Sequence, residues 1–344
     1  MKVVPESRVH SGELREELTH ALSFHFGAKQ PIRNLHRRRS NYSSSNTIEN
    51  LQVELENGRR LGLIFKDLSP TSLLEAARQV RPQFVYSPQR EIQIYRTLLD
   101  PARFETPVCY GFVERPDIER YWLFLERVEG PLLWQVGRVA VWEHSARWLA
   151  LFHSHFAHHR PASGTDLTRF GRELCTRWMN RAEEFLQPQW GARSNGLLKQ
   201  FDLLARKYER VIGPLLSMPQ TFIHAEFYPS NIILGGTGPD KRVCAIDWER
   251  GALGPGLVDL AALVSGSWTD EQKKHFVAVY RNSLEPAGDW PPPINEMLEL
   301  VDYCQLYLAV QWLGWAEDWS PPKSHDQNWL QEAVRISKRL GLLG

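Results

Sequence analysis

Hydrophobic residues recur at helix and strand spacing along most of the chain, and they predict a protein of mixed helices and strands. The first regular segment runs from Gly12 to Phe26, where leucine and alanine residues fall on one helical face. Ser11 is placed to cap this helix and Gly27 to end it. This pattern predicts an amphipathic helix that packs against a core.

Two hairpins are predicted before residue 130. In the first, apolar and polar residues alternate, Asn57-Gly58 gives a strong turn signal, and residues 61–68 form the returning strand. In the second, an apolar run at 108–113 is joined by a polar turn to another at 121–126. Four antiparallel strands are therefore expected in this region.

The rest of the chain is predicted to be mainly helical. Helical patterns cover residues 141–156, 170–186, 195–216, 269–283 and 293–315. One further hairpin interrupts them, with strands at 232–234 and 242–246. Gly130-Pro131 breaks the strand pattern between the two regions, so the hydrophobic pattern predicts an α+β protein in two parts.

Composition narrows the class without naming a function. The 344 residues suffice for two ordinary lobes, and 42% hydrophobic and 24% charged content is typical of a soluble globular protein. A net charge of +1 gives no reason to expect nucleic acid or an anionic membrane as a partner. The chain shows no apolar run of signal-peptide or membrane-span length, and its four cysteines form no C-x-x-C pair. A reducing cytoplasmic location is expected.

The candidate chemistry is concentrated between Ile223 and Asp259. Glu226 and Asn231 lie five residues apart, Asn231 directly precedes one strand of the short hairpin, and the other strand delivers Asp247. The hairpin would bring Asn231 and Asp247 to the same end, where an amide oxygen and a carboxylate suit Mg2+. Glu226 would lie one short loop away, within reach of an acceptor hydroxyl.

This spacing resembles the catalytic loop of kinases, H-x-D-x-x-x-x-N followed by a metal-binding Asp. Pro229 and the Ile-Asp-Trp-Glu sequence around Asp247 look like the aminoglycoside phosphotransferase and choline kinase branch. The chain departs from that family's H-G-D at two positions, with Ala225 for Gly and Glu226 for Asp. The resemblance implies a two-lobe, protein-kinase-like α+β fold. Its lobes would be residues 1–127, with nucleotide binding on an antiparallel sheet plus helix, and residues 128–344, mainly helical, with the catalytic loop and acceptor pocket.

The family pattern also implies a nucleotide site in the first lobe. Lys66 ends an apolar strand and would touch the nucleotide phosphates, paired with Glu91 on the next helix; Glu75 is the second choice. Ser87 would cap that helix, with Pro88 in its first turn. The Ser43-Ser44-Ser45 turn could lay N–H groups and hydroxyls over the phosphates, although Ser-rich turns are also common as solvated loops.

A hinge between the lobes is implied by the sequence around Gly130. There the Glu126 carbonyl and the Val128 N–H would face the adenine edge.

Supporting roles are predicted for several polar residues. The Asp259 carboxylate would accept backbone N–H groups of the catalytic loop, and His224 would tie that loop to the metal-binding segment. His155 and His159 have the i,i+4 spacing of a zinc pair, but no Cys or carboxylate nearby completes a site. Candidates for acceptor contacts are Glu183, Glu184, Glu317 and Asp318, of which the first two also suit a solvated helix face.

The resulting hypothesis is an ATP- or GTP-dependent, Mg2+-dependent phosphotransferase acting on a hydroxyl of a small molecule. Aminoglycosides, sugars and amino alcohols are all compatible acceptors, and the protein would be a monomer or a homodimer. One alternative is a catalytically silent, nucleotide-binding scaffold. Another is a protein kinase, which is disfavoured because no Asp-Phe-Gly and Ala-Pro-Glu pair brackets an activation segment after Asp247.

Overall fold

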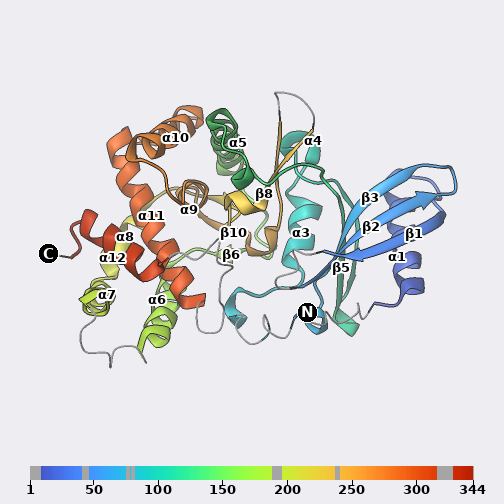
Figure 1. Ribbon diagram of the computed structural model, residues 1–344, viewed down its shortest axis with the longest axis horizontal. Helices are drawn as coiled ribbons and strands as arrows, with labels where there is room; N and C mark the ends of the chain where they lie inside the picture. Colours follow the sequence, from blue (N-terminus) through green and yellow to red (C-terminus); the bar gives the residue numbers. More distant parts are fainter. Residues whose placement is uncertain are drawn as a thin grey trace. The chain divides into compact units, whose positions relative to one another are not determined.

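The alternating strands of the first 130 residues form a five-stranded antiparallel sheet (Figure 1). Its strand order is β1-β2-β3-β5-β4. The strands are β1 (Ile32–Arg39), β2 (Thr47–Leu55), β3 (Arg60–Asp67), β4 (Cys109–Arg115) and β5 (Arg120–Glu126). The predicted hairpins are confirmed, and Gly58 takes the positive φ of 82° that its turn requires.

The computed structural model describes residues 9–40, 46–74, 78, 82–187, 196–236, 241–315 and 328–343. They divide into two compact units. The first unit is Met1–Gly130 together with Cys244–Glu249, and the second is Pro131–Val243 together with Arg250–Gly344. The chain therefore returns to the first unit for six residues after leaving it.

The first helix, α1 (Ser11–Phe26), covers one face of this sheet, with its leucines buried against the strands. Gly27 ends it in the left-handed conformation, as predicted, with φ of 65°. The predicted cap was wrong by one residue, because Ser11 is already helical. The His10 side chain caps the helix instead and accepts a hydrogen bond from the Gly12 N–H at 3.3 Å.

Strand β1 was not predicted. Its sequence IRNLHRRR is dominated by charged and polar residues, so it carries no clear apolar alternation. It forms because β2 offers a free edge, and Arg37 binds the Glu49 carboxylate across the pair at 2.7 Å. Tertiary pairing here overrides the weak local signal.

The helix that carries Glu91 is α3 (Arg90–Thr97), and a short helix, α4 (Pro101–Phe104), follows it. The buried face has the predicted register, with Ile92, Tyr95 and Leu99 inside. The predicted start was wrong, since α3 begins at Arg90 and its cap residue makes no side-chain hydrogen bond. One-turn 3-10 helices at Pro70–Ser72, Gln83–Val85 and Pro116–Ile118 complete this unit's described connections.

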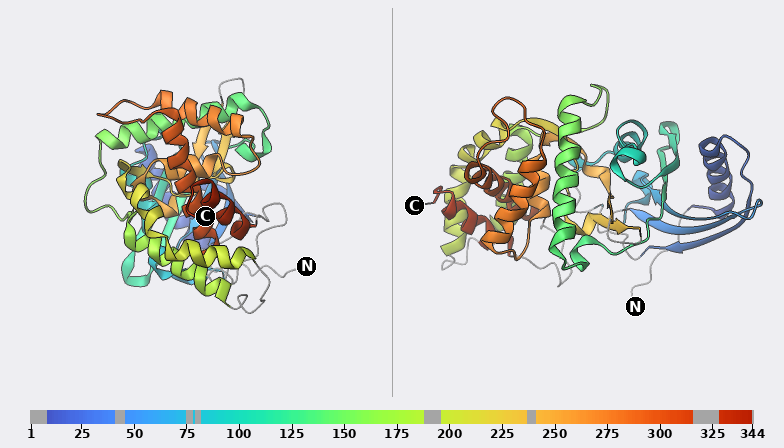
Figure 2. Two further views of the ribbon diagram at one scale, coloured as in Figure 1. Left: turned by 90° about the vertical axis from the view of Figure 1, so that its left-hand side faces the viewer. Right: turned by 90° about the horizontal axis from the view of Figure 1, so that it is seen from above.

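The second unit is mainly helical, as predicted (Figures 1 and 2). Its long helix α11 (Ile294–Trp315) packs against five other described helices and forms the centre of the helical core. The remaining helices are α5 (Val139–His158), α6 (Arg172–Leu186), α7 (Gly196–Arg206), α8 (Glu209–Ser217), α9 (Leu257–Leu263), α10 (Asp270–Ser283) and α12 (Trp329–Arg339). The single helix predicted over 195–216 was wrong, because a turn at residues 207–208 divides it into α7 and α8.

Two small sheets position the loops of the second region. One has the order β6-β10-β7, from β6 (Thr168–Arg169), β10 (Ala252–Pro255) and β7 (Gln220–Ile223). The other is the predicted hairpin of β8 (Ile232–Gly235) and β9 (Arg242–Ala245). Strand β7 runs into the segment from His224 to Asn231, which we call the catalytic loop.

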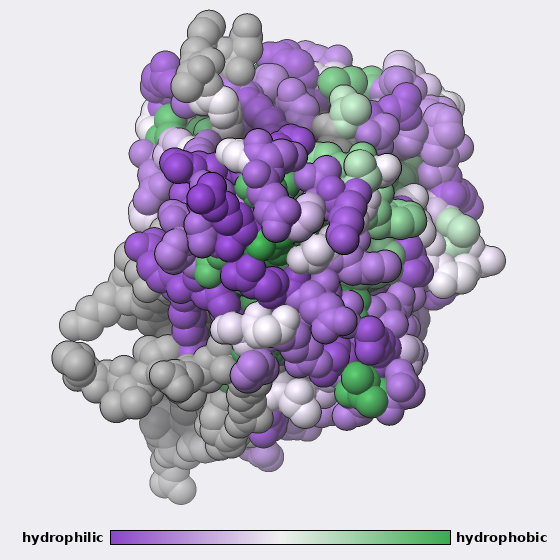
Figure 3. Space-filling model, turned by 90° about the vertical axis from the view of Figure 1, so that its right-hand side faces the viewer, coloured by the Kyte–Doolittle hydropathy of each residue, from purple (hydrophilic) through white to green (hydrophobic). Residues whose placement is uncertain are grey.

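The surface in Figure 3 is largely hydrophilic, and its apolar areas are small and separated by polar side chains. In the part of the chain that the structure describes, no helix combines the length and apolarity that a membrane crossing needs.

A close contact between α1 and β4 gives a stability prediction. A Cβ added at Gly111 would lie 2.6 Å from the Ala21 Cβ, whereas one added at Gly62 would meet nothing nearer than 3.6 Å. We expect Gly111→Ala to lower the free energy of unfolding by about 1–3 kcal/mol, through overpacking and through the strain of a side chain at its φ of 154°. Gly62→Ala, the matched control, should change it by less than about 0.5 kcal/mol. Chemical denaturation of both variants measures this, and equal effects would contradict the packing argument.

Candidate functional site

Lys66 lies near the end of β3, and its ammonium group is held between two carboxylates of the first unit. Lys66 Nζ is 2.7 Å from Glu91 Oε1 and 2.8 Å from Asp247 Oδ1. Three elements distant in sequence supply these groups: a sheet strand, helix α3 and the segment after β9. The ion pair predicted between Lys66 and Glu91 is present.

Burial and charge act in opposite directions on this cluster. Burial alone lowers the pKa of Lys66, but the Asp247 and Glu91 carboxylates outweigh it and raise that pKa above its ordinary value. Burial raises the pKa of Glu91 to about 7, against the effect of Lys66. Lys66 is therefore a fixed positive charge, and its attraction opposes the protonation of Glu91 that burial favours.

Glu91 also links the cluster to the backbone. Its Oε1 accepts a second hydrogen bond, from the Trp248 N–H at 3.2 Å, and Trp248 is fully buried. Glu91 thus holds both the lysine and the segment that carries Asp247, which is a positioning role for two functional groups at once.

Asp247 has an unusual backbone conformation, with φ of 68°. A non-glycine residue in the left-handed region costs on the order of 1 kcal/mol or more, and such strain is concentrated at functional sites. The Asp247 side chain is 35% exposed, whereas that of Lys66 is 9% exposed. Asp247 therefore presents a partly open carboxylate beside a buried cation.

The catalytic loop in the second unit is shaped by Asp259. This carboxylate is fully buried at the start of α9 and accepts the backbone N–H groups of His224 at 2.7 Å and Ala225 at 2.8 Å. The predicted role of Asp259 as an acceptor for loop N–H groups is confirmed. Ala225 adopts φ of 66°, a conformation that glycine takes without strain, so these hydrogen bonds hold the loop in a strained form.

His153 supports Asp259 and was not identified from the sequence. Its Nε2 lies 3.2 Å from Asp259 Oδ2 and its Nδ1 lies 2.8 Å from the Tyr280 hydroxyl, and His153 is buried. Of the histidines on α5, only His155 and His159 were predicted as candidates. A histidine on the buried face of an otherwise apolar helix was the available signal.

The predicted i,i+4 pair, His155 and His159, is formed by two rings that contact each other. The rings of His155 and His159 stack with centroids 4.3 Å apart, and His159 Nδ1 is 3.0 Å from the His155 carbonyl oxygen. Among the described residues, no group of three or more His, Cys, Asp or Glu side chains is placed to hold a metal ion.

Glu226 and Asn231 are oriented by backbone contacts within the loop. The Asn231 amide nitrogen donates to the Glu226 carbonyl oxygen at 3.0 Å, and the Glu226 N–H donates to His224 Nδ1 at 3.3 Å. His224 therefore supports its own loop. The Glu226 side chain is 22% exposed and lies 3.8 Å from the Arg250 guanidinium.

The donors at Asp247 and Asn231 have the chemistry that Mg2+ requires. Asp247 offers a carboxylate, and Asn231, with its amide nitrogen already donating, offers an amide oxygen. Hard oxygen ligands of this kind, completed by water and substrate phosphates, are typical of Mg2+ sites. The residues therefore fit the metal, and its binding by this pair stays a prediction.

The other predicted site residues are placed as follows. Glu126 is the last residue of β5 and its carboxylate accepts the Val108 N–H at 3.0 Å, while Val128 follows in the connection toward Gly130. Glu183 lies on α6, where burial raises the pKa of its carboxyl. The predicted residues outside the described part of the chain are Ser43, Ser44, Ser45, Glu75, Glu317 and Asp318.

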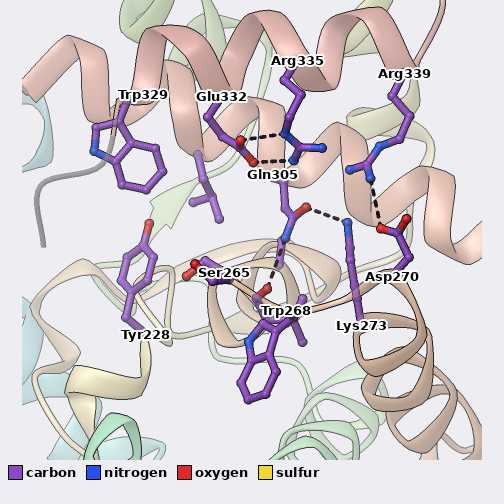
Figure 4. Close-up of a pocket in the computed structure, with 15 residues that line it drawn as sticks. Tyr228, Ser265, Trp268, Asp270, Lys273, Gln305, Trp329, Glu332, Arg335 and Arg339 are labelled. Atoms are coloured by element: carbon purple, nitrogen blue, oxygen red, sulfur yellow. Dashed lines mark hydrogen bonds and ion pairs between the residues drawn. The ribbon is translucent and has the colours of Figure 1, made fainter.

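A cavity of about 530 Å3 opens beside the catalytic loop in the second unit (Figure 4). Tyr228 of the loop and Trp329 lie at one end, with the Tyr228 hydroxyl directed toward the Trp329 ring. Helices α10, α11 and α12 supply most of the other lining groups. Several of its charged groups are paired with one another, such as Arg335 with Glu332 and Arg339 with Asp270, and Lys273 donates to the amide oxygen of Gln305. The cavity is polar and mixed in charge, with aromatic rings at its edge.

Comparison with known proteins places the chain among kinase-like folds. The family model described as the phosphotransferase enzyme family matches residues 45–293, which include both the Lys66 cluster and the catalytic loop. The sequence matches no curated protein.

Several solved structures are similar in fold. A microcompartment-associated aminopropanol kinase is 18% identical, with 89% of this chain and 90% of that chain covered and a TM-score of 0.56. An ethanolamine kinase of Plasmodium vivax is 14% identical, with coverage of 98% and 91% and a TM-score of 0.57. A spectinomycin phosphotransferase in complex with ADP and spectinomycin is 11% identical, with coverage of 98% and 100% and a TM-score of 0.57. These likenesses confirm the predicted two-lobe, kinase-like α+β fold.

Asp259 gives a testable consequence of this geometry. In Asp259→Asn one carboxylate oxygen becomes an NH2 group facing a backbone N–H, so a buried donor loses its acceptor. We expect the free energy of unfolding to fall by about 1–3 kcal/mol. Asp202→Asn, which removes an ion pair on the surface of α7, is the matched control and should cost less than about 1 kcal/mol. Similar losses in denaturant titrations of the two variants would show that Asp259 does not hold the loop.

Proposed function

The chain belongs to the phosphotransferase enzyme family, as its motifs predicted, and from this premise we propose that it transfers the terminal phosphoryl group of ATP to a hydroxyl of a small molecule. The observation that carries the proposal is Lys66, whose ammonium group is held at 2.7 Å by Glu91 and at 2.8 Å by Asp247. A buried lysine paired with a helix carboxylate, beside a partly open aspartate, is the arrangement that kinase-like enzymes use to bind nucleotide phosphates.

Each residue then has a distinct part in the transfer. Lys66 would bind nucleotide phosphate oxygens, with Glu91 fixing its position. Asp247 and Asn231 would hold Mg2+, which when bound neutralises charge on the phosphate oxygens. The acceptor oxygen bonds to the terminal phosphorus, the bond from that phosphorus to the bridging oxygen breaks, and ADP leaves. Glu226 orients the acceptor hydroxyl and takes its proton.

The two parts of the chain have different roles in this proposal. We assign nucleotide binding to residues 1–127 and the catalytic loop with the acceptor pocket to 128–344, with Asp247 as the exception that belongs to the first compact unit. Glu126 and Val128 would meet the adenine edge.

We assign the acceptor to the cavity beside Tyr228. Its volume of about 530 Å3 lies in the range of sites for small ligands. Tyr228 is two residues from Glu226, and its hydroxyl accepts a hydrogen bond from Trp312 Nε1 at 2.7 Å, so the loop and the cavity wall are linked. Paired charges and serine hydroxyls suit a polar acceptor that carries several hydrogen-bonding groups, and the amino-alcohol kinases and the spectinomycin phosphotransferase named above support this class.

The two alternatives make different predictions. A silent nucleotide-binding scaffold would be stabilised by ATP without phosphorylating any acceptor, and the family match offers it no support. A protein kinase would transfer label from ATP to protein substrates.

The first test is turnover. Purified protein with Mg-ATP and a panel of amino alcohols, sugars and aminoglycosides should yield ADP and a phosphorylated acceptor. Asp247→Asn should lower kcat at least about 100-fold, because the metal's charge stabilisation is worth several kcal/mol. Asp202→Asn, far from the cluster in sequence and exposed, is the control. Full activity of Asp247→Asn would refute the metal assignment, and thermal stabilisation by ATP without transfer to any acceptor would favour the scaffold.

A second test concerns the cavity. Ser267 lines it from an exposed connection, so Ser267→Trp would fill part of the space at little cost in stability. We expect the acceptor KM to rise about tenfold or more, by loss of uniform binding, while the ATP KM changes less than about twofold. Ser163→Trp, in an exposed turn that does not line the cavity, is the matched control. An unchanged acceptor KM would place the acceptor elsewhere.

A further inference from the structure

Arg250 is a buried cation that the proposed chemistry does not use. It follows directly after the Asp247 segment and is only 4% exposed. Within the described part of the chain, its Nε and Nη1 atoms are buried and have no hydrogen-bond partner. Leaving charged donors unpaired in the interior costs a free energy on the order of several kcal/mol, so a compensating group is expected close by.

Aromatic rings supply one part of that compensation. The guanidinium carbon lies 5.6 Å from the ring centroid of Trp178 on α6 and 5.4 Å from that of Trp315 at the end of α11. Both distances are within the range of cation–π attraction. The two rings fix the guanidinium in place, but they do not accept its N–H groups as a carboxylate would.

Among the described residues, the carboxylate that forms an ion pair with this guanidinium is Glu226, the proposed base. Arg250 Nη1 is 3.8 Å from Glu226 Oε1. This is too long for a hydrogen bond but short enough for strong electrostatic attraction, particularly because Arg250 is buried. Glu226 is 22% exposed, so its side chain has room for the movement of about 1 Å that would form the bond.

We propose that Arg250 is a positioning residue for Glu226, holding one carboxylate oxygen so that the other faces the acceptor hydroxyl. A carboxylate has about four lone-pair sites and can accept from both groups at once. Glutamate in place of the family's aspartate extends the side chain by one C–C bond, roughly 1.5 Å. Glu226 and Arg250 are then a matched pair, in which the longer acid is held by a cation that packs against two tryptophans. The inference rests on the proposed function, in which Glu226 meets the acceptor.

The other polar groups near Glu226 have contacts of their own, so Arg250 is the proposed partner of its carboxylate. His224 accepts the Glu226 N–H through its ring, and Asp259 is occupied by two backbone N–H groups. Burial first, and then the Glu226 charge, raise the pKa of Tyr228, so its phenol stays neutral. Arg250 is the cation among these four groups, and its removal would favour protonation of Glu226.

The kinetic test is a double-mutant cycle. Arg250→Met keeps an unbranched side chain against the two tryptophans and removes the charge. We expect it to lower kcat roughly 10- to 100-fold, to leave the ATP KM unchanged, and to move the acidic limb of the pH profile of kcat to higher pH. Arg250→Lys should recover part of kcat. When Glu226→Asp is already present, Arg250→Met should lower kcat less than about threefold, because the shorter acid no longer reaches the guanidinium.

Two results would overturn the proposal. The first is an equal loss of kcat from Arg250→Met with Glu or Asp at 226, since this would show that the two side chains are not coupled. The second is a raised acceptor KM with unchanged kcat and pH profile, since this would show that Arg250 binds an anionic group of the acceptor instead.

A double-mutant cycle of melting temperatures tests the pairing of Glu226 with Arg250 independently of turnover. Glu226→Gln should lower the melting temperature in the Arg250 protein, where it removes the carboxylate paired with a buried cation, and leave it unchanged in Arg250→Met. Equal shifts in both backgrounds would refute the pairing whether or not turnover is found. Coupled shifts without turnover on any acceptor would refute the proposed function and retain the pair.

Discussion

The catalytic loop depends on a single buried charge. The Asp259 carboxylate is removed from water, and it is tolerated because the N–H groups of His224 and Ala225, together with the ring of His153, satisfy it. Those hydrogen bonds hold Ala225 in a left-handed conformation, and this conformation in turn sets the direction in which the chain continues toward Glu226. The requirement to pair a buried anion thus shapes this segment, together with the burial of Phe227 against Trp148.

The first unit also depends on the pairing of a buried charge, which here is positive. There a buried cation, Lys66, is held by Glu91 and Asp247, and Glu91 binds the Trp248 N–H as well. One glutamate therefore sets the position of a strand residue and of a loop residue that are far apart in sequence. In both units, polar groups rather than apolar packing fix the functional side chains, while the apolar core supplies a rigid frame for them.

Sequence reasoning succeeded where the determining signal is local. The turn at Asn57-Gly58 is specified by two residues, and the order of strand, Lys66, helix and Glu91 follows from short hydrophobic patterns. It failed where contacts between residues distant in sequence determine the structure. Strand β1 depends on the edge of β2, and His153 acquires its role from a carboxylate more than a hundred residues away. The burial of Arg250 against two tryptophans likewise has no local signature, because those rings come from separate helices.

The return of the chain to the first unit at Cys244–Glu249 has a consequence for how this protein is made. A ribosome releases the sheet and α3 long before it releases Asp247, since folding during synthesis proceeds from the N-terminus. Lys66 can meet Glu91 early, yet the third member of the cluster arrives only after about half of the helical region has emerged. The first unit is therefore a discontinuous domain, and a fragment that ends at Gly130 would contain the lysine and the glutamate but not the aspartate.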